Sequence, residues 1–238
     1  MNLPDPDLQR WLAAVTAQPD SGTDFMPWLQ GPVRAFFPFS AVFMAHGELM
    51  AGQIRITHLL TDGHEPQYLE QLAKTFELEQ RGSLKWWLAN RLPFCIDPQS
   101  PPPFASKLEI DEIRAFGFRN VAAHGVLNLR ANAGTYFSFA GLPGSVGPWH
   151  LDALRLLTPI LNDLYLAHIA TQPTSGALAL MALTRRQRDI VRLVATGIDD
   201  KTVGRHLGVT EKTVRNQLCE IYVGLGVHKR AQLVAMLR

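Results

Sequence analysis

The sequence has no apolar run that approaches the ~18 residues a membrane-spanning helix needs. Its first residues, MNLPDPDLQR, have neither the basic start nor the apolar stretch of a signal peptide, so we expect no export signal and no membrane partner. Only two cysteines occur, Cys95 and Cys219, and they form no CxxC pair. These absences predict a protein of the reducing cytoplasm without a disulfide framework or a cysteine zinc site.

The composition is that of a folded chain, because 47% of the 238 residues are hydrophobic and 18% are charged. Charge is distributed unevenly. Residues 177–238 contain 11 Lys and Arg against 5 Asp and Glu, whereas residues 1–176 contain 12 against 16. A short basic segment after an acidic body predicts a domain that binds a polyanion and a separate domain with another task.

The domain boundary is predicted where Pro, Ser, Thr and Gly cluster without apolar periodicity, from Thr171 to Gly176. We therefore expect a first domain over residues 1–170, a linker over 171–178 and a second domain over 179–238.

The first domain reads as mixed α+β. Helices are predicted around Leu8 to Val15, around Leu69 to Phe76 after Pro66, and over residues 84–92. Strands are predicted over residues 35–45, 53–60, 121–129 and 134–140, with a turn at His46-Gly47 and loops at 101–103 and 130–133. The order of helices, hairpins and a long closing helix resembles a GAF- or PAS-like sensory or dimerisation domain.

The closing helix is predicted over residues 150–170. Its apolar stripe has 3,4,3,4 spacing and consists of Leu154, Leu157, Leu161, Leu164 and His168. This stripe is either the seam of a homodimer or a face that packs on the sheet of its own chain.

The last 55 or so residues carry the most specific pattern. Thr184, Asp199 or Asp200, and Thr210 are helix N-caps, and Gly197 and Gly208 end helices. The predicted buried positions are Ile190, Val191, Val194, Val203, Leu207, Val214, Leu218, Ile221, Leu233, Val234 and Leu237. Two short helices joined by a tight Gly-containing turn form a helix-turn-helix, whose second helix fits the major groove of DNA.

This segment resembles the LuxR/FixJ-type (GerE) DNA-binding domain. The matching residues include Leu183-Thr184, Leu207-Gly208-Val209-Thr210-Glu211, Thr213-Val214-Arg215 and Leu225-Gly226-Val227. The resemblance implies an all-α four-helix domain in a transcriptional regulator rather than an enzyme, with double-stranded DNA as partner, a homodimer, RNA polymerase as a further candidate partner, and no cofactor. The sequence departs from the family at Gln187, Val203-Gly204, Gln217 and Gly224.

The residues expected to touch DNA lie opposite the apolar face of the third helix. Arg215 and Asn216 match family positions that face the major groove, where Arg suits guanine and Asn suits adenine. Lys212 and Cys219 share this face. The predicted phosphate contacts are Lys201, Thr210, Thr213, Lys229 and Arg230.

The effector of the first domain is left open. The acyl-homoserine-lactone receptors of the LuxR family pair a Trp with a Tyr four residues later and then an Asp-Pro; here Trp87 and Asp97-Pro98 are present, but Arg91 replaces the Tyr. The layout also resembles EpsA-type regulators found with exopolysaccharide gene clusters. Candidate ligand contacts for an unknown small molecule are Phe43, Trp86, Trp87 and Tyr136, although core packing is the favoured interpretation of the aromatic residues in this domain.

Other chemistry is not expected. No receiver-type acidic cluster can be assembled. His58 and His64 with Asp62 and Glu65 match no zinc spacing, so we interpret them as a solvated loop and expect no metal. The stretch from Pro143 to Gly147 has a proline where a nucleophile elbow needs glycine, so neither it nor any other segment supplies a catalytic residue.

Overall fold

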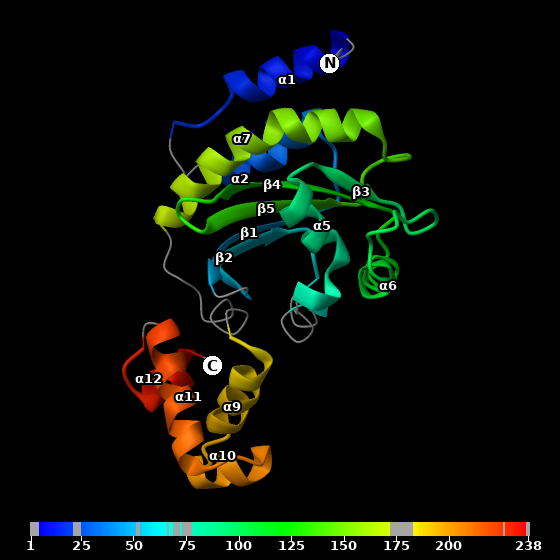
Figure 1. Ribbon diagram of the computed structural model, residues 1–238. Helices are drawn as coiled ribbons and strands as arrows, with labels where there is room; N and C mark the ends of the chain where they lie inside the picture. The colour runs from blue at the N-terminus through cyan, green and yellow to red at the C-terminus, as the bar shows by residue number, and fades with distance from the viewer. Residues whose placement is uncertain are drawn as a thin grey trace.

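The computed structural model describes residues 5–20, 25–50, 53–65, 67–68, 72, 78–171, 183–225 and 227–236. Within these ranges the chain forms an α+β domain followed by four helices (Figure 1). No helix of these ranges is long and apolar enough to cross a membrane. The predicted linker over residues 171–178 falls almost entirely outside the described residues, so the domain bounds stay a prediction.

A five-stranded antiparallel sheet in the order β2-β1-β5-β4-β3 forms the centre of the first domain. Its strands are β1 (Ala41–Met50), β2 (Gln53–Asp62), β3 (Phe94–Ile96), β4 (Val121–Asn128) and β5 (Ala133–Ala140). Both predicted hairpins are confirmed, because β1 pairs with β2 and β4 pairs with β5. Asn132 supplies the turn of the second hairpin with a φ of 49°, a value that Asn tolerates better than most residues.

The first predicted strand was wrong at both ends. Ala35 lies in α3 (Arg34–Phe36), and β1 begins only at Ala41. Phe37 leaves the helical region with φ −120° and ψ 87°, since the following Pro38 disfavours a helical residue before it. The predicted turn at His46-Gly47 is instead a β-bulge, where the register against β2 shifts while β1 continues.

Helices cover both faces of the sheet (Figure 1). One face packs against α7 (Pro148–Ala170), α2 (Phe25–Trp28) and the π-helical turn η2 (Leu29–Val33), with α1 (Asp5–Thr16) outside them. The other face carries η3 (Leu78–Gln80), α5 (Gly82–Asn90) and α6 (Lys107–Ala115). The predicted helices at α1, α5 and α7 are confirmed, whereas the one over Leu69 to Phe76 lies, apart from Leu72, outside the described residues.

Several elements were not predicted from the sequence, among them β3, α2 and α6. For α6 a local signal was present. Ser106 and Glu109 form a capping box, in which the Ser106 side chain accepts from the Glu109 N–H and the Glu109 carboxylate accepts from the Ser106 N–H. The short strand β3 has no such signal, since three residues show no measurable periodicity.

The stripe on α7 belongs to the core of its own domain. Leu154, Leu157 and Leu161 are fully buried and Leu164 nearly so, packed with Met44 and other apolar residues of the sheet. The alternative of a dimer seam along this stripe is therefore wrong. α7 continues through Pro159, whose side chain is exposed.

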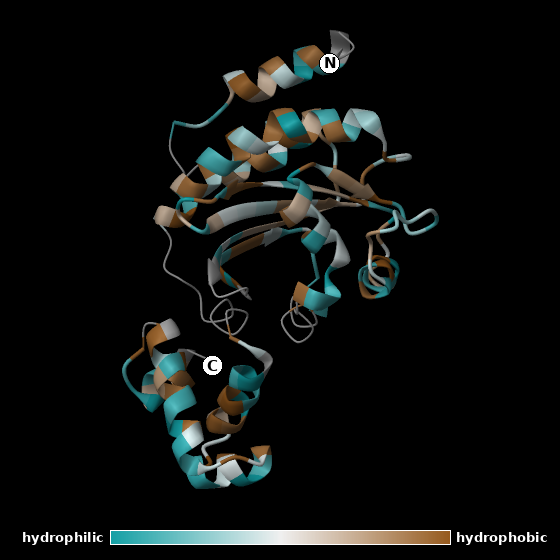
Figure 2. Ribbon diagram, viewed as in Figure 1, coloured by the Kyte–Doolittle hydropathy of each residue, from teal (hydrophilic) through white to brown (hydrophobic). Residues whose placement is uncertain are grey.

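The second domain consists of α9 (Arg185–Ala195), α10 (Asp200–Leu207), α11 (Glu211–Gly224) and α12 (Arg230–Met236). Its helices are amphipathic, with hydrophobic and hydrophilic residues on different sides (Figure 2). Most of the predicted buried residues form one cluster, which also contains Leu183 and Val227. The predicted Leu207 and Val234 are only partly buried against it, and Leu237 lies outside the described residues. The fourth helix starts at Arg230, two residues later than predicted.

Because the α7 stripe is buried in the core, we expect its leucines to contribute to the free energy of unfolding. Leu161→Ala should lower the free energy of unfolding by about 2–5 kcal/mol, because it leaves a cavity in a packed core. Leu166→Ala on the same helix is the control and should change it little, since Leu166 is 37% exposed. Urea unfolding followed by tryptophan fluorescence measures this, because all five tryptophans lie in the first domain. If Leu161→Ala left the urea unfolding midpoint unchanged but abolished a dimer, the stripe would be a dimer interface after all.

Candidate nucleic-acid interface and candidate ligand cavity

Local caps fix the ends of the helices in the second domain. Thr184 and Gln187 form a capping box at the start of α9, so the glutamine fills the role that glutamate has in such boxes. Asp199 accepts from the Thr202 N–H at 2.7 Å, and Thr210 accepts from the Thr213 N–H at 3.1 Å. Each cap satisfies an N–H group that the helix itself leaves unpaired.

The turn between α10 and α11 is tight and depends on two glycines. Gly208 has φ 66°, a left-handed value that suits glycine. At Gly204, a Cβ atom would lie 2.7 Å from the Val209 carbonyl oxygen, so the turn approaches α10 more closely than a larger residue permits. The departure from the family at Gly204 thus matches the close packing of this turn.

The outer face of α11 is exposed as the sequence predicted. With Val214, Leu218 and Ile221 buried, the side chains that reach solvent are those of Lys212, Thr213, Arg215, Asn216, Cys219 and Glu220. A single helix with a free face of this kind fits the major groove, which is about 12 Å wide. The contacts of these residues with DNA stay a prediction.

Arg215 is exposed and contacts two carboxylates of its own domain. Its guanidinium lies 2.5 Å from a Glu211 carboxylate oxygen one turn earlier and 3.8 Å from an oxygen of Asp200 on α10, while 67% of its side chain is exposed. Exposed pairs of this kind contribute ~0–1 kcal/mol, so they orient Arg215 without fixing it.

The predicted phosphate contacts fall into two groups. Lys201 and Lys229 are exposed, and Thr210 and Thr213 lie at the N-terminus of α11, where N–H groups and the helix dipole favour anions. Arg230 is instead tied within the domain: it donates to Asp200 at 2.6 Å and to the Ile198 carbonyl oxygen. It therefore attaches α12 to the start of α10, a role that no local pattern signals because 30 residues separate Arg230 from Asp200.

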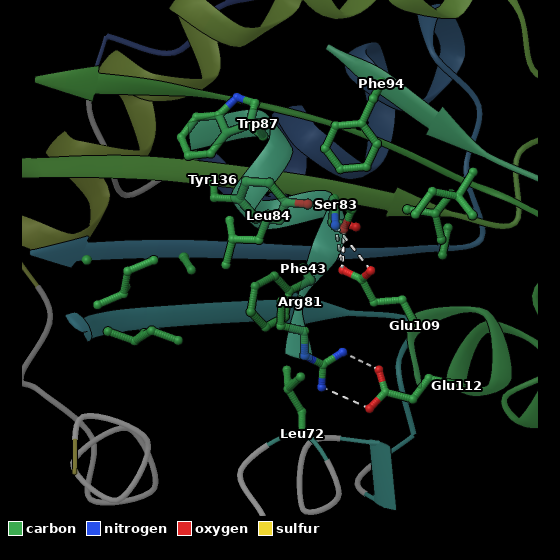
Figure 3. Close-up of a pocket in the computed structure, with 18 of the residues that line it drawn as sticks. Phe43, Leu72, Arg81, Ser83, Leu84, Trp87, Phe94, Glu109, Glu112 and Tyr136 are labelled. Carbon is green, nitrogen blue, oxygen red and sulfur yellow. Dashed lines mark hydrogen bonds and ion pairs between the residues drawn. The ribbon is translucent and has the colours of Figure 1, made fainter. Parts of the chain in front are cut away.

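A second candidate site lies in the first domain, on the sheet face opposite α7. A cavity of about 150 Å³ opens between β1, β5 and β4 on one side and α5 and α6 on the other (Figure 3). Phe43, Trp87 and Tyr136, three of the four predicted ligand contacts, line it. The fourth, Trp86, lies outside this lining and stacks on Phe104 with ring centroids 4.4 Å apart.

The aromatic residues pack in buried clusters on both faces of the sheet. The core interpretation is confirmed for Phe36, Phe37, Phe39, Phe137 and Phe139, which pack in the α7 core. Phe43 and Trp87 are also buried, in two smaller clusters, with Tyr136 and Phe118 packed against them, and all four of these residues line the cavity as well.

Trp87 lines the cavity and packs against β4 and β5. Its indole N–H donates to His124 Nδ1 at 3.3 Å. The ring packs so closely on Gly125 that a Cβ atom at this position would lie 2.7 Å from a ring carbon of Trp87. Burial, with a smaller contribution from Arg155, lowers the pKa of His124 to about 4, so the imidazole is neutral and can accept this bond. The Trp87 N–H is therefore already used within the protein.

The polar wall of the cavity comes from the start of α5 and from α6, and it was not predicted. Arg81 and Glu112 form a buried two-bond ion pair (Figure 3). The Glu109 carboxylate accepts from the N–H and hydroxyl groups of both Ser83 and Ser106. The sequence signal was limited to the Ser106–Glu109 spacing, because Arg81 is 31 residues from Glu112 and Ser83 is 26 residues from Glu109.

His64 is not part of a solvated loop, and that interpretation was wrong for it. Its ring stacks on Tyr68 with centroids 4.2 Å apart and lines the cavity, and burial lowers its pKa to about 4. Asp62 pairs instead with Arg34 at 2.7 Å. Among the described residues no group of three or more metal-binding side chains comes together.

The contacts of Arg230 within the second domain predict that Arg230 contributes to its stability and that the neighbouring Lys229 does not. Arg230→Ala should weaken the second domain by about 1–3 kcal/mol, because it removes charge-assisted hydrogen bonds to Asp200 and Ile198. Lys229→Ala is the matched control and should leave stability unchanged. Amide hydrogen exchange in α10 and α12 reports the difference; equal protection in both variants would contradict the tether.

Comparison with known proteins agrees with this geometry. Residues 181–237 match the model of the family "Bacterial regulatory proteins, luxR family". A helix-turn-helix-type transcriptional regulator of Mycobacterium tuberculosis is 42% identical over 53 residues, which are 22% of this chain and 6% of that protein. The regulator GfsR of Streptomyces halstedii is 38% identical over 69 residues, covering 29% and 28% of the two chains. This chain thus spans only a small part of the relatives it matches.

The chain also resembles a solved structure in fold. The crystal structure of CepR2 from Burkholderia cenocepacia, an N-acylhomoserine-lactone-dependent LuxR-family transcription factor, superposes with a TM-score of 0.52 at 13% identity, over 70% of this chain and 96% of that one. At this identity the likeness concerns the fold alone. The predicted fold class is confirmed: an α+β domain with an antiparallel sheet precedes a C-terminal helical domain that matches the luxR-family model.

Proposed function

We propose that this protein is a DNA-binding transcriptional regulator, in which α11 enters the major groove and the first domain senses a small molecule. The observation that carries the proposal is the outer face of α11. Arg215 and Asn216 are exposed there, while the preceding Val214 is fully buried on the inner face. Arg reads guanine and Asn reads adenine through paired hydrogen bonds. Such a regulator works where the chromosome is, in the cytoplasm, and acts on RNA polymerase.

The proposed assembly is a homodimer that places two copies of α11 on two half-sites of a nearly palindromic operator. The apolar stripe of α7 is not available for this dimer, since it is buried in its own chain. The dimer contact is therefore expected elsewhere on the molecule.

Two finer proposals concern the signal and the target. The fold shared with CepR2 supports an acyl-homoserine-lactone receptor as the alternative. Against it, Arg91 replaces the tyrosine of the receptor pattern, and it is exposed beyond the end of α5 with a φ of 57°. The layout shared with EpsA-type regulators supports exopolysaccharide genes as the target.

Binding to genomic promoter fragments at several salt concentrations tests the proposal. Arg215→Ala should cost about 1–3 kcal/mol on the preferred site and relax its sequence preference. Lys229→Ala should weaken binding to all sequences alike and reduce the dependence of log K on log salt by about one, as the loss of one phosphate contact does. Fluorescence anisotropy gives both values.

The outcome that contradicts the proposal is specific. If both variants bind like the parent, the assigned face of α11 does not read DNA. If the parent shows no affinity for any duplex even in low salt, the protein is not a DNA-binding regulator. Bound promoters, once sequenced, also show whether exopolysaccharide genes are among the targets.

A further inference from the structure

We propose that the cavity of the first domain binds a small uncharged aromatic molecule that carries a hydrogen-bond acceptor, such as a ketone or amide carbonyl. This inference rests on the sensing part of the proposed function and adds the chemical class of the effector. It follows from the size of the cavity, from the pairing of its charges, and from polar groups that have no partner among the described residues.

Size and lining favour a compact aromatic ligand. An apolar cavity of about 150 Å³ has the volume that accommodates benzene, whereas sites for drug-sized ligands range over ~300–1,000 Å³. Aromatic rings reach this cavity from β1 (Phe43), β3 (Phe94), α5 (Trp87) and β5 (Tyr136) (Figure 3). Rings so arranged offer both faces and edges to a bound ring.

The charges on the lining disfavour a charged ligand. Glu48 pairs with Arg55, Glu112 with Arg81, and the Glu109 carboxylate accepts from two N–H groups and two hydroxyls. An anion would meet three carboxylates and one guanidinium. A cation would lose its hydration and find the oxygens of Glu109 already occupied. Because a buried charge needs a partner of its own, an uncharged ligand fits best.

The neutral polar groups of the lining are the ones left to bind a ligand. No described residue hydrogen-bonds to the Tyr136 hydroxyl, whereas the hydroxyl of Tyr165, on the opposite face of the sheet, donates to the Met44 carbonyl oxygen at 3.2 Å. Burial, with Glu109 nearby, raises the pKa of Tyr136, so its hydroxyl remains a donor at neutral pH.

His64 is a second polar residue of the lining. Both of its ring nitrogens are buried without a hydrogen-bond partner among the described residues. A neutral imidazole offers one donor and one acceptor, and buried groups of this kind are normally paired. A ligand with a carbonyl oxygen would satisfy a donor of this lining, which a hydrocarbon cannot do.

Four probes of similar shape test the charge and the acceptor separately on the full chain. Isothermal titration calorimetry at pH 7 compares acetophenone, ethylbenzene, benzoate and benzylamine. Acetophenone should bind. Ethylbenzene should bind about three- to tenfold more weakly, the effect of one hydrogen bond. Benzoate and the benzylammonium ion should bind more weakly still, by at least about tenfold relative to acetophenone.

Two variants link the binding to this cavity. Tyr136→Phe should lower the affinity for acetophenone about three- to tenfold and leave that for ethylbenzene unchanged. Tyr165→Phe is the matched control and should change neither. Ala45→Met, on the floor of the cavity, should abolish binding of both neutral probes while the tryptophan-monitored unfolding midpoint is retained.

The results that overturn the inference differ from those that overturn the proposed function. Failure of acetophenone to bind, stronger binding of a charged probe, or equal effects of Tyr136→Phe on both neutral probes would each refute the ligand class. DNA affinity of the same preparation is measured alongside. DNA binding without probe binding refutes only the inference, and probe binding without DNA binding refutes only the regulator.

Discussion

The alternation of side chains along the strands of one sheet divides the first domain into two interiors. Neighbouring residues of β1 and β5 point to opposite faces, so Met44 and Phe137 enter the core under α7 while Phe43 and Tyr136 face the cavity. The long helix α7 fills the first interior with leucines. The second is covered by shorter helices and leaves about 150 Å³ unfilled. A one-residue shift of register would exchange the two sets.

The second domain could be predicted almost entirely, because its determinants are local. Thr184, Asp199 and Thr210 each cap a helix through the residue three positions later, and Gly208 ends α10 through its own φ. Such contacts lie within one helical turn of the sequence that encodes them. The start of the fourth helix was the exception, and there the described structure places no cap of this kind.

The first domain was predicted less completely, because its determinants act between distant segments. Periodicity showed that the leucines of α7 share a face, but whether that face meets a sheet or another chain depends on residues about 110 positions away. The aromatic residues show the same limit: composition cannot say that Phe137 is buried in the core while Tyr136 faces a cavity. The Glu109 and Glu112 network was missed since its partners at 81 and 83 come from another helix.

Asp200 contacts two arginines of the second domain that have different proposed roles. Its carboxylate lies 2.6 Å from Arg230 and 3.8 Å from Arg215, so one acid at the start of α10 positions both the fourth helix and the proposed reading residue. The two contacts differ in exposure, since 34% of the Arg230 side chain is exposed against 67% for Arg215. An exposed pair contributes ~0–1 kcal/mol. A two-bond contact of arginine with guanine discriminates by ~1–3 kcal/mol. The carboxylate contacts of Arg215 are therefore weak enough for a base to replace them in the proposed complex, whereas the shorter, less exposed contact of Arg230 keeps α12 attached.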